Sequence, residues 1–254
     1  MNEQYRPLHL FVDSKEIATD NHIRVQGRSN MTLLPDFFTI DIYNLPDVEE
    51  SLIRNGKIMY ALGFDNSTLC YGTIEDIYSH VEGANDVISV SISDGQEFWD
   101  AKVNKTISAG VRIKETIAAI LKGAVIGSYL ADNPRLVRGQ TLSGSLPQIV
   151  QNMASGVNAR AFISHGAVHI VGKGQSNDVV TVRDDEIISV PGYANGVCIA
   201  YVKVKGFAVG SMIYFKDGYY RLVAQAVDAD NFNGTWQTQL ILVDESQVEN
   251  MGGW

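Results

Sequence analysis

The stretch that decides the fold is residues 39–103. Its segments include Thr39-Ile-Asp-Ile-Tyr-Asn-Leu45, Lys57-Ile-Met-Tyr-Ala-Leu62 and Asp86-Val-Ile-Ser-Val-Ser-Ile92. Apolar residues alternate with polar ones in the first and last of these segments, which is the period-2 pattern of strands that bury one face. Glycine and asparagine residues separate the segments. We therefore expect an antiparallel meander with one short helix folded into it.

The short helix is expected between Asp47 and Gly56. The carboxylate of Asp47 can accept hydrogen bonds from the free N–H groups of the first turn. Gly56 can end the helix because glycine tolerates a positive φ at this position. We expect the apolar side of the helix to close one mouth of a small β-barrel, through Val48, Leu52 and Ile53.

A second, shorter version of this layout appears near the C-terminus. Gly210-Ser-Met-Ile-Tyr214 echoes Gly56-Lys-Ile-Met-Tyr60, and Tyr219-Tyr-Arg-Leu222 echoes Tyr71-Gly-Thr-Ile74. After each copy we expect a long polar loop and then an alternating strand that ends on an aspartate. The echo predicts a duplicated small β-barrel.

Other segments extend the two copies. Residues 8–12 and 23–26 are expected to form an opening hairpin. The next strand is expected to start at about Phe37, with Phe37 and Phe38 in the core, because Pro35 cannot donate to a strand ladder. In the second copy we expect residues 197–204 to be the longest strand.

A segment of different character lies between the copies. Residues 113–122 place isoleucine and leucine on one stripe at helical spacing, and residues 145–154 begin with a serine and an early proline, as helices do. Residues 159–171 read Ala-Arg-Ala-Phe-Ile, a turn, and Ala-Val-His-Ile-Val, which is typical of a hairpin. The chain is therefore expected to be mainly β with an α+β insert. Its expected parts are a first tube-type β-barrel domain (1–106), the insert (107–176) and a second tube-type β-barrel domain (177–254).

Composition places the chain among ordinary globular proteins. Of its 254 residues 45% are hydrophobic and 19% charged, and no window approaches the roughly 18 uninterrupted apolar residues of a membrane helix. No signal peptide is expected at the N-terminus, and no membrane insertion. Cys70 and Cys198 are the only thiols and are expected to be small buried hydrophobes, which excludes a disulfide framework. The tail that ends at Trp254 has no pattern and is expected to be loose or docked on a partner, and the terminal tryptophan suggests docking.

The net charge of −9 argues against a protein that grips phosphates, because affinity for nucleic acid comes mainly from clustered lysine and arginine. An acidic surface is compatible with a different relation to DNA, in which the polymer passes a wall of like charge without binding.

Histidine and glycine motifs suggest no catalytic, cofactor or metal site. His165 and His169 have the i, i+4 spacing of a metal-ligand pair on a helix, but Gly166 places a turn between them. Gly172-Lys-Gly174 is similar to a phosphate loop but precedes no helix. We expect no metal, no cofactor and no catalytic residue.

Paired carboxylates occur at Asp184-Asp185-Glu186 and at Asp228 and Asp230. Two carboxylates that flank a groove are the minimum for a glycosidase. Both runs lie in expected turns, where aspartate bonds the local backbone, so we favour a structural role. The pair Glu49 and Glu50 is expected to lie on a solvated helix face.

Taken together, these segments resemble a known family. The combination of Phe38-Thr-Ile-Asp-Ile-Tyr-Asn-Leu45, the helix, Gly56-Lys-Ile-Met-Tyr60 and Tyr71-Gly-Thr-Ile74 resembles the baseplate hub proteins of tailed phages. This family includes late control gene D proteins and the hubs of contractile injection machines. Residues 210–242 look like the second barrel of that family.

The resemblance implies a structural protein of a virion or phage-like particle, assembled in the bacterial cytoplasm. It implies a homotrimer in which each chain gives two tube-type barrels, so that three chains form a six-fold-like ring. Such a ring would join the hexameric tail tube to the central spike and leave a channel for DNA. The family offers no catalytic residues to carry over. The chain is short for this family, so an added lysozyme or spike-binding domain is not expected.

Two other classes remain open. A distal tail or tube-initiator protein would use the same barrel once and assemble as a hexamer, and it is distinguished by whether residues 197–243 form a second barrel. A carbohydrate-binding β module or a hydrolase would need a groove served by residues such as Asp184 and Asp185.

Overall fold

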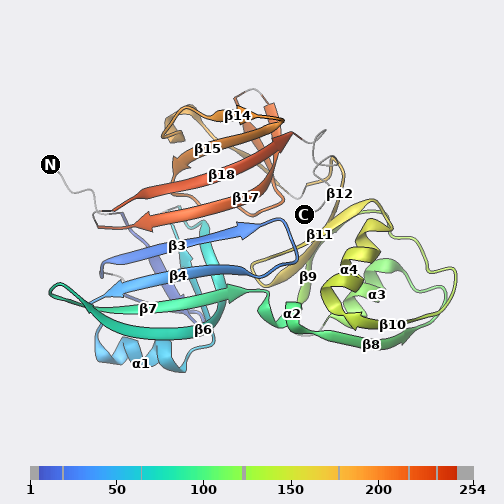
Figure 1. Cartoon of the computed structure of the whole chain (residues 1–254), viewed down its shortest axis with the longest axis horizontal. Helices are drawn as coiled ribbons and strands as arrows, with labels where there is room; N and C mark the ends of the chain where they lie inside the picture. Colours follow the sequence, from blue (N-terminus) through green and yellow to red (C-terminus); the bar gives the residue numbers. More distant parts are fainter. Residues whose placement is uncertain are drawn as a thin grey trace.

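The structure is a computed structural model of the chain. It describes residues 6–18, 20–63, 65–121, 124–176, 178–216, 218–232 and 234–244. The tail with Trp254, expected from the sequence to be loose or docked, lies outside the described residues. Figure 1 shows two rolled sheets that follow one another and a lobe of helices and short strands beside them. The predicted class, mainly β with an α+β insert, is confirmed.

The first rolled sheet surrounds one apolar core. Its elements are β1 (His9–Val12), β2 (Lys15–Ile17), β3 (Ile23–Asn30), β4 (Asp36–Tyr43), α1 (Asp47–Asn55), β5 (Ile58–Leu62), β6 (Thr68–Glu82) and β7 (Asn85–Asp94). The strand order is β3-β4-β7-β6-β5-β1-β2. Alternate residues of the strands, such as Leu10, Ile40 and Val90, point into the core. The period-2 pattern of residues 39–103 therefore reports a buried face.

The second rolled sheet has its own core. Its elements are β13 (Val179–Thr181), a 3-10 turn (Asp184–Glu186), β14 (Gly192–Ala194), β15 (Val197–Lys203), β16 (Met212–Phe215), β17 (Gly218–Asp230) and β18 (Trp236–Asp244). The strand order is β14-β15-β18-β17-β16-β13. Cys198, Phe215 and Leu240 are among the fully buried residues of this core.

The lobe beside the sheets contains both predicted helices and the predicted hairpin. Its elements are α2 (Gln96–Asp100), β8 (Lys102–Ile107), α3 (Ile113–Ile120), β9 (Val125–Leu130), β10 (Gln140–Ser145), α4 (Leu146–Ser155), β11 (Ala159–Ser164) and β12 (Ala167–Gly172). Phe98 of α2 and Val103 of β8 belong to the core of this lobe, and β8 pairs with β10. The division of the chain into 1–106, 107–176 and 177–254 stays a prediction.

The long polar loops predicted after residues 71–74 and 219–222 are wrong in both copies. The chain continues there as strand, so that β6 has 15 residues and β17 has 13. The outer half of β6 is mostly exposed, which gives it the polar composition of a loop. β17 is therefore the longest strand of the second copy, not residues 197–204.

Several local predictions also need correction. Phe38 is buried, but Phe37 is exposed because neighbouring residues of a strand point to opposite faces. Asp47 makes no capping bond, since Pro46 occupies the N-cap, and Gly56 has a φ of −77°. Val48 is exposed, so only the C-terminal part of α1 covers the core.

The opening hairpin is shorter than predicted. β1 pairs with β2 across a tight turn at Asp13 and Ser14, both with positive φ, and on its other side with β5. β3 does not pair with β1. Its partners are β4 and the distant β17.

Two buried carboxyl groups lie where the lobe meets the first sheet. Asp36 and Asp94 are opposite each other in β4 and β7 and are 2% and 5% exposed. Asp36 accepts a hydrogen bond from the Asn30 N–H (3.0 Å), and Asp94 accepts one from the Gly166 N–H of the lobe (2.8 Å). Burial, with a contribution from Asp94, raises the pKa of Asp36 to about 8, and burial raises the pKa of Asp94 to about 6.

We expect Asp36→Asn to stabilise the protein increasingly as the pH rises. The pKa of Asp36 is higher in the folded chain than in the unfolded one, so the unfolded state alone ionises between about pH 4 and pH 8 and wild-type stability falls over that window. Between pH 5 and pH 8 the variant should gain roughly 2 kcal/mol or more over the wild type. Urea unfolding at pH 5, 6.5 and 8 measures this. Asp86→Asn, at an exposed site of β7, is the matched control. The same pH dependence of the unfolding free energy in Asp36→Asn and wild type would contradict the raised pKa of Asp36.

Candidate functional interface

The two rolled sheets are joined by direct strand pairing. The outer half of β17 pairs antiparallel with β3, from Ala224 opposite Asn30 to Asp230 opposite Arg24. One sheet therefore runs without interruption in the order β14-β15-β18-β17-β3-β4-β7-β6, and Figure 1 shows these strands stacked in this order. We call the pairing of β17 with β3 the junction.

Apolar side chains cross the junction into the first core. Val227 and Ala229 of β17 are 2% and 0% exposed, and they belong to the core cluster of the first sheet. The first core is thus completed by a strand of the second copy. Burial of apolar surface is the dominant favourable term in such an association, so the two copies stabilise each other.

Polar groups fix the register at the end of the junction. Asn231 accepts a hydrogen bond from the Ile23 N–H (2.8 Å) and donates one to the Asn21 carbonyl (3.0 Å). The carboxylate of Asp230 lies 3.0 Å from His22 Nε2, and the His22 ring stacks on Tyr43 with 4.0 Å between centroids. The tip of the β17–β18 hairpin is therefore held at the start of β3.

The carboxylates Asp228 and Asp230 thus have structural partners. Asp228 accepts a hydrogen bond from Gln26 Nε2 (3.0 Å) and lies 3.7 Å from Arg24. The sequence predicted a turn for this pair, but both residues lie in β17 and bind groups of β3 or the segment before it.

A β-bulge lets β17 serve two partners. Its first residues pair with β16, and the register with β18 shifts between Leu222 and Ala224. Beyond this extra residue, the edge of β17 that faces away from β18 pairs with β3 instead of β16. Gly27 of β3, which is opposite Val227, leaves no room for a side chain, because a Cβ at this position would lie 2.3 Å from the ring of Phe38 in β4.

The central strands of the two copies are paired in the same register. Tyr60 is opposite Tyr71 in the first copy, as Tyr214 is opposite Tyr219 in the second. In both copies a bulge follows at the same place, after Ile74 in β6 and after Leu222 in β17. The strand order β3-β4-β7-β6-β5-β1 recurs as β14-β15-β18-β17-β16-β13. Residues 197–243 therefore form a second sheet that resembles the first, as the duplication predicted.

The copies also differ. β13 runs parallel to β16, whereas β1 runs antiparallel to β5. The segment between β15 and β16, which is wholly within the described residues, has no helix in the place of α1.

The face of the continuous sheet that points away from the cores is polar and carries charges of both signs. Ser89 donates to Asp41 (2.6 Å) and Gln239 donates to the Tyr201 hydroxyl (2.8 Å). The charged residues that alternate with core residues on these strands include Arg24, Arg28, Lys203, Asp41, Asp76, Glu82, Asp228 and Asp230. Among the described residues this face therefore carries no basic patch.

The histidines singled out in the sequence lie in the hairpin of the lobe. Nδ1 of His169 is 2.9 Å from the Ser128 hydroxyl, and the His169 ring stacks on Phe162. Burial lowers the pKa of both His165 and His169, which favours neutral packing residues. Among the described residues no group of three or more histidines, cysteines and carboxylates is placed to hold a metal.

The structure also shows where the glycine motif and the two cysteines noted in the sequence lie. Gly172 ends β12, and Gly174 follows it in a turn with a φ of +69°. Both cysteines are buried, Cys70 in the first core and Cys198 in the second. No helix of the described residues is both long and apolar enough to cross a membrane.

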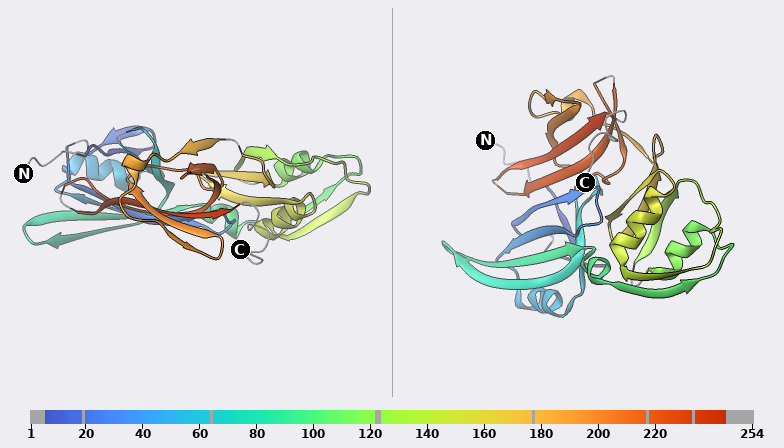
Figure 2. Two further views of the ribbon diagram at one scale, coloured as in Figure 1. Left: turned by 90° about the horizontal axis from the view of Figure 1, so that it is seen from above. Right: turned by 45° about the vertical axis from the view of Figure 1, so that its right-hand side comes forward.

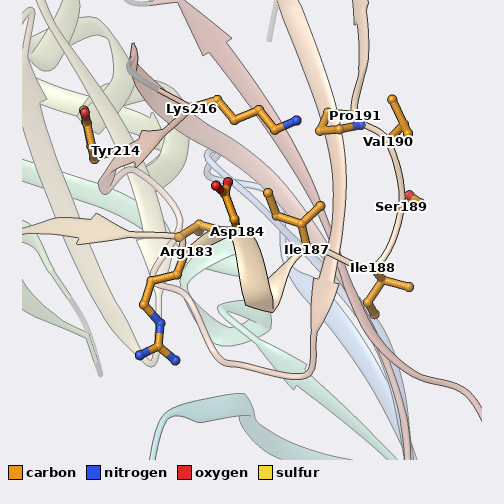
Figure 3. Close-up of a pocket in the computed structure, with 10 residues that line it drawn as sticks. Arg183, Asp184, Ile187, Ile188, Ser189, Val190, Pro191, Tyr214 and Lys216 are labelled. Carbon is orange, nitrogen blue, oxygen red and sulfur yellow. The ribbon is translucent and has the colours of Figure 1, made fainter.

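An open hollow of 680 Å³ lies beside β14 (Figure 3). Asp184 is the one carboxylate in its lining, and its side chain points away from that of Arg183. Asp185 instead lies 3.3 Å from Arg183, and Glu186 lies 3.5 Å from Lys205. The hollow therefore does not present the two carboxylates that a glycosidase needs.

Sequence reasoning missed the junction residues His22, Val227 and Asn231. The available signal was the alternation of valine and alanine with aspartate in residues 227–230, which is a strand pattern. A strand alone does not identify its partner, and β3 is about 200 residues away.

The sequence matches no family model, and no curated protein matches it. Solved structures do match. A 43 kDa tail protein of prophage MuSo2 from Shewanella oneidensis has a TM-score of 0.67 at 8% identity over 94% of this chain and 98% of its own. A tail protein of Neisseria meningitidis gives 0.64 at 13% identity, covering 94% of this chain and 96% of that one.

A third match links the fold to secretion systems. An Escherichia coli component of the type VI secretion system, described as structurally similar to tail proteins of bacteriophage T4, gives a TM-score of 0.63 at 9% identity. It covers 92% of this chain and 76% of that one. At these identities the likeness concerns the fold. The resemblance predicted from the sequence is confirmed at that level.

We expect Asn231→Ala to weaken the junction. The substitution leaves the buried Ile23 N–H without its acceptor, which should cost about 1–3 kcal/mol of unfolding free energy. Asn55→Ala, which removes an exposed side-chain bond within α1, is the matched control and should cost about 0.5 kcal/mol or less. Urea unfolding followed by tryptophan fluorescence measures both. Equal effects of the two substitutions would show that Asn231 does not hold the copies together.

Proposed function

We propose that this protein is the structural baseplate hub of a phage tail or phage-like injection particle. In this role three copies form a pseudo-hexameric ring that joins the hexameric tail tube to the central spike. One observation carries the proposal: a single chain contains two sheets of the same strand order and register, joined edge to edge. The tail-protein fold of the matching structures supports the same role.

The geometry of the junction explains why copies of this fold can form a ring. The junction joins different edges of the two copies, so it is a head-to-tail contact. Head-to-tail contacts repeated around an axis generate a ring when the rotation closes. Three chains with two copies each would supply six similar sheets to a six-fold tube and three identical chains to a three-fold spike.

The proposal assigns a passive relation to DNA. The polar face of the continuous sheet lacks a cluster of lysine and arginine among the described residues, and such clusters provide most of the affinity for phosphates. A channel lined by this face would let DNA pass without specific binding. An acidic channel wall stays a hypothesis, since this face carries charges of both signs. The proposed location is the virion tail, after assembly in the host cytoplasm, and no catalytic residue, metal or cofactor is assigned.

The distal tail or tube-initiator protein is the second candidate. That role uses one barrel per chain, whereas here residues 197–243 repeat the first sheet. The carbohydrate-binding module finds no specific support, because a single aromatic residue, Tyr214, lines the hollow beside β14.

We expect the purified protein to be a homotrimer of about 84 kDa, three times the 27.9 kDa of one chain. Multi-angle light scattering at tens of micromolar measures the mass, and negative-stain images should show an annulus with six lobes and three-fold symmetry. A hexamer would favour the tube-initiator role instead. A monomer at every concentration, also with tail tube protein added, would contradict the proposal.

A further inference from the structure

Two strand edges at opposite ends of the continuous sheet have no strand beside them within the described residues. Residues 76–82 of β6 pair with β7 on one side only, and β14 pairs with β15 on one side only. Figure 1 shows β14 and β6 at the two ends of the row of strands. Each end thus presents unpaired backbone N–H and C=O groups.

The internal match between the copies says what these edges correspond to. After the bulge, residues 76–82 of β6 are equivalent to 224–230 of β17, the part that pairs with β3. Through the pairing of β14 with β15 and of β3 with β4, residues 192–194 of β14 are equivalent to 26–28 of β3. The two open edges are therefore equivalent to the two strands that meet in the junction.

Exposure of side chains agrees with this correspondence. Val81 of β6 is 70% exposed, whereas the equivalent Ala229 is fully buried in the junction. Ser79 is exposed at the position where Val227 is buried. A large apolar side chain on an open edge is an energetic cost that a covering sheet would remove.

We propose that the open edge of β6 pairs with β14 of a second copy of this chain and so reproduces the junction between subunits. The register copied from the junction places Tyr78 opposite Ala194, Ser79 opposite Tyr193 and His80 opposite Gly192. Val81 then enters the second core of the neighbouring subunit, as Ala229 enters the first core within the chain. The inference rests on the proposed ring and names the surface that closes it.

The hollow beside β14 fits the same arrangement. Within the chain, the tip of the β17–β18 hairpin packs at the start of β3 through Asn231. Between chains, the tip of the β6–β7 hairpin reaches the segment before β14, where Val190 is 92% exposed and borders the hollow (Figure 3). Figure 2 shows this hairpin projecting past the sheet at the end away from the lobe.

The same features explain how the free subunit avoids uncontrolled pairing. β14 has three residues, and the open half of β6 carries charged groups such as Asp76 and Glu82. Short edges and charged side chains both discourage strand addition by unrelated chains. The two edges therefore pair with each other, in the register of the junction, rather than with unrelated strands.

Disulfide trapping tests the register. In a Cys198→Ala background, which removes the thiol nearest β14, Tyr78→Cys is combined with Ala194→Cys. Opposite residues of an antiparallel pair have Cα atoms about 4.5–5.5 Å apart, which a disulfide can span. Mild oxidation of the assembled protein should convert most of it into covalently linked dimers and trimers on a non-reducing gel. The pair Ala226→Cys and Arg28→Cys, at the equivalent in-chain positions, should instead form a bond within one chain.

Two further variants separate the possible outcomes. His80→Cys with Ala194→Cys, shifted by two residues, should cross-link at least about tenfold less. Val81→Asp should abolish the trimer while leaving the far-ultraviolet circular dichroism unchanged, because Val81 is exposed in the single chain. A trimer that forms without the Tyr78–Ala194 cross-link would overturn this pairing and leave the hub proposal standing. Absence of both trimer and cross-link would overturn both, and equal trapping of the shifted pair would overturn the register.

Discussion

The structure depends on the way β17 divides its free edge between two partners. Its first residues hold β16 within the second sheet, and its outer half holds β3 of the first sheet. Because Val227 and Ala229 are buried in the first core, this edge is an apolar contact as well as a hydrogen-bonded one. Without it the chain would consist of two small sheets, and the core of the first would lack Val227 and Ala229.

Local patterns were sufficient to predict much of the fold, because they report burial along a strand or helix. The strand at residues 86–92, the hairpin at residues 159–171 and the helices α3 and α4 of the lobe follow from such patterns. The predictions failed where a strand has no buried face and where an aromatic residue lies on the exposed face. The outer half of β6 is strand without a buried face, so its composition indicated a loop. Phe37 is an aromatic residue on the exposed face, so its type indicated the core.

The interface was harder to predict than the fold. Asp228 and Asp230 were visible as a carboxylate pair, but their partners Gln26 and His22 come from a strand and a turn near the other end of the chain. Such pairings depend on tertiary register, which a single sequence does not specify. The echo between residues 56–74 and 210–222 came closest, because a repeat in sequence carries the register of one copy over to the other.

The bulge that occurs in both β6 and β17 also determines which side chains of each strand point inward. Before it the even-numbered residues of β17, such as Leu222, point inward, and after it the odd-numbered ones, such as Val227, do so. Loss of the single extra residue would rotate the outer half by one step and bring Asp228 into the place of Val227. One backbone irregularity thus lets the inner half of the strand serve its own fold while the outer half faces a neighbour.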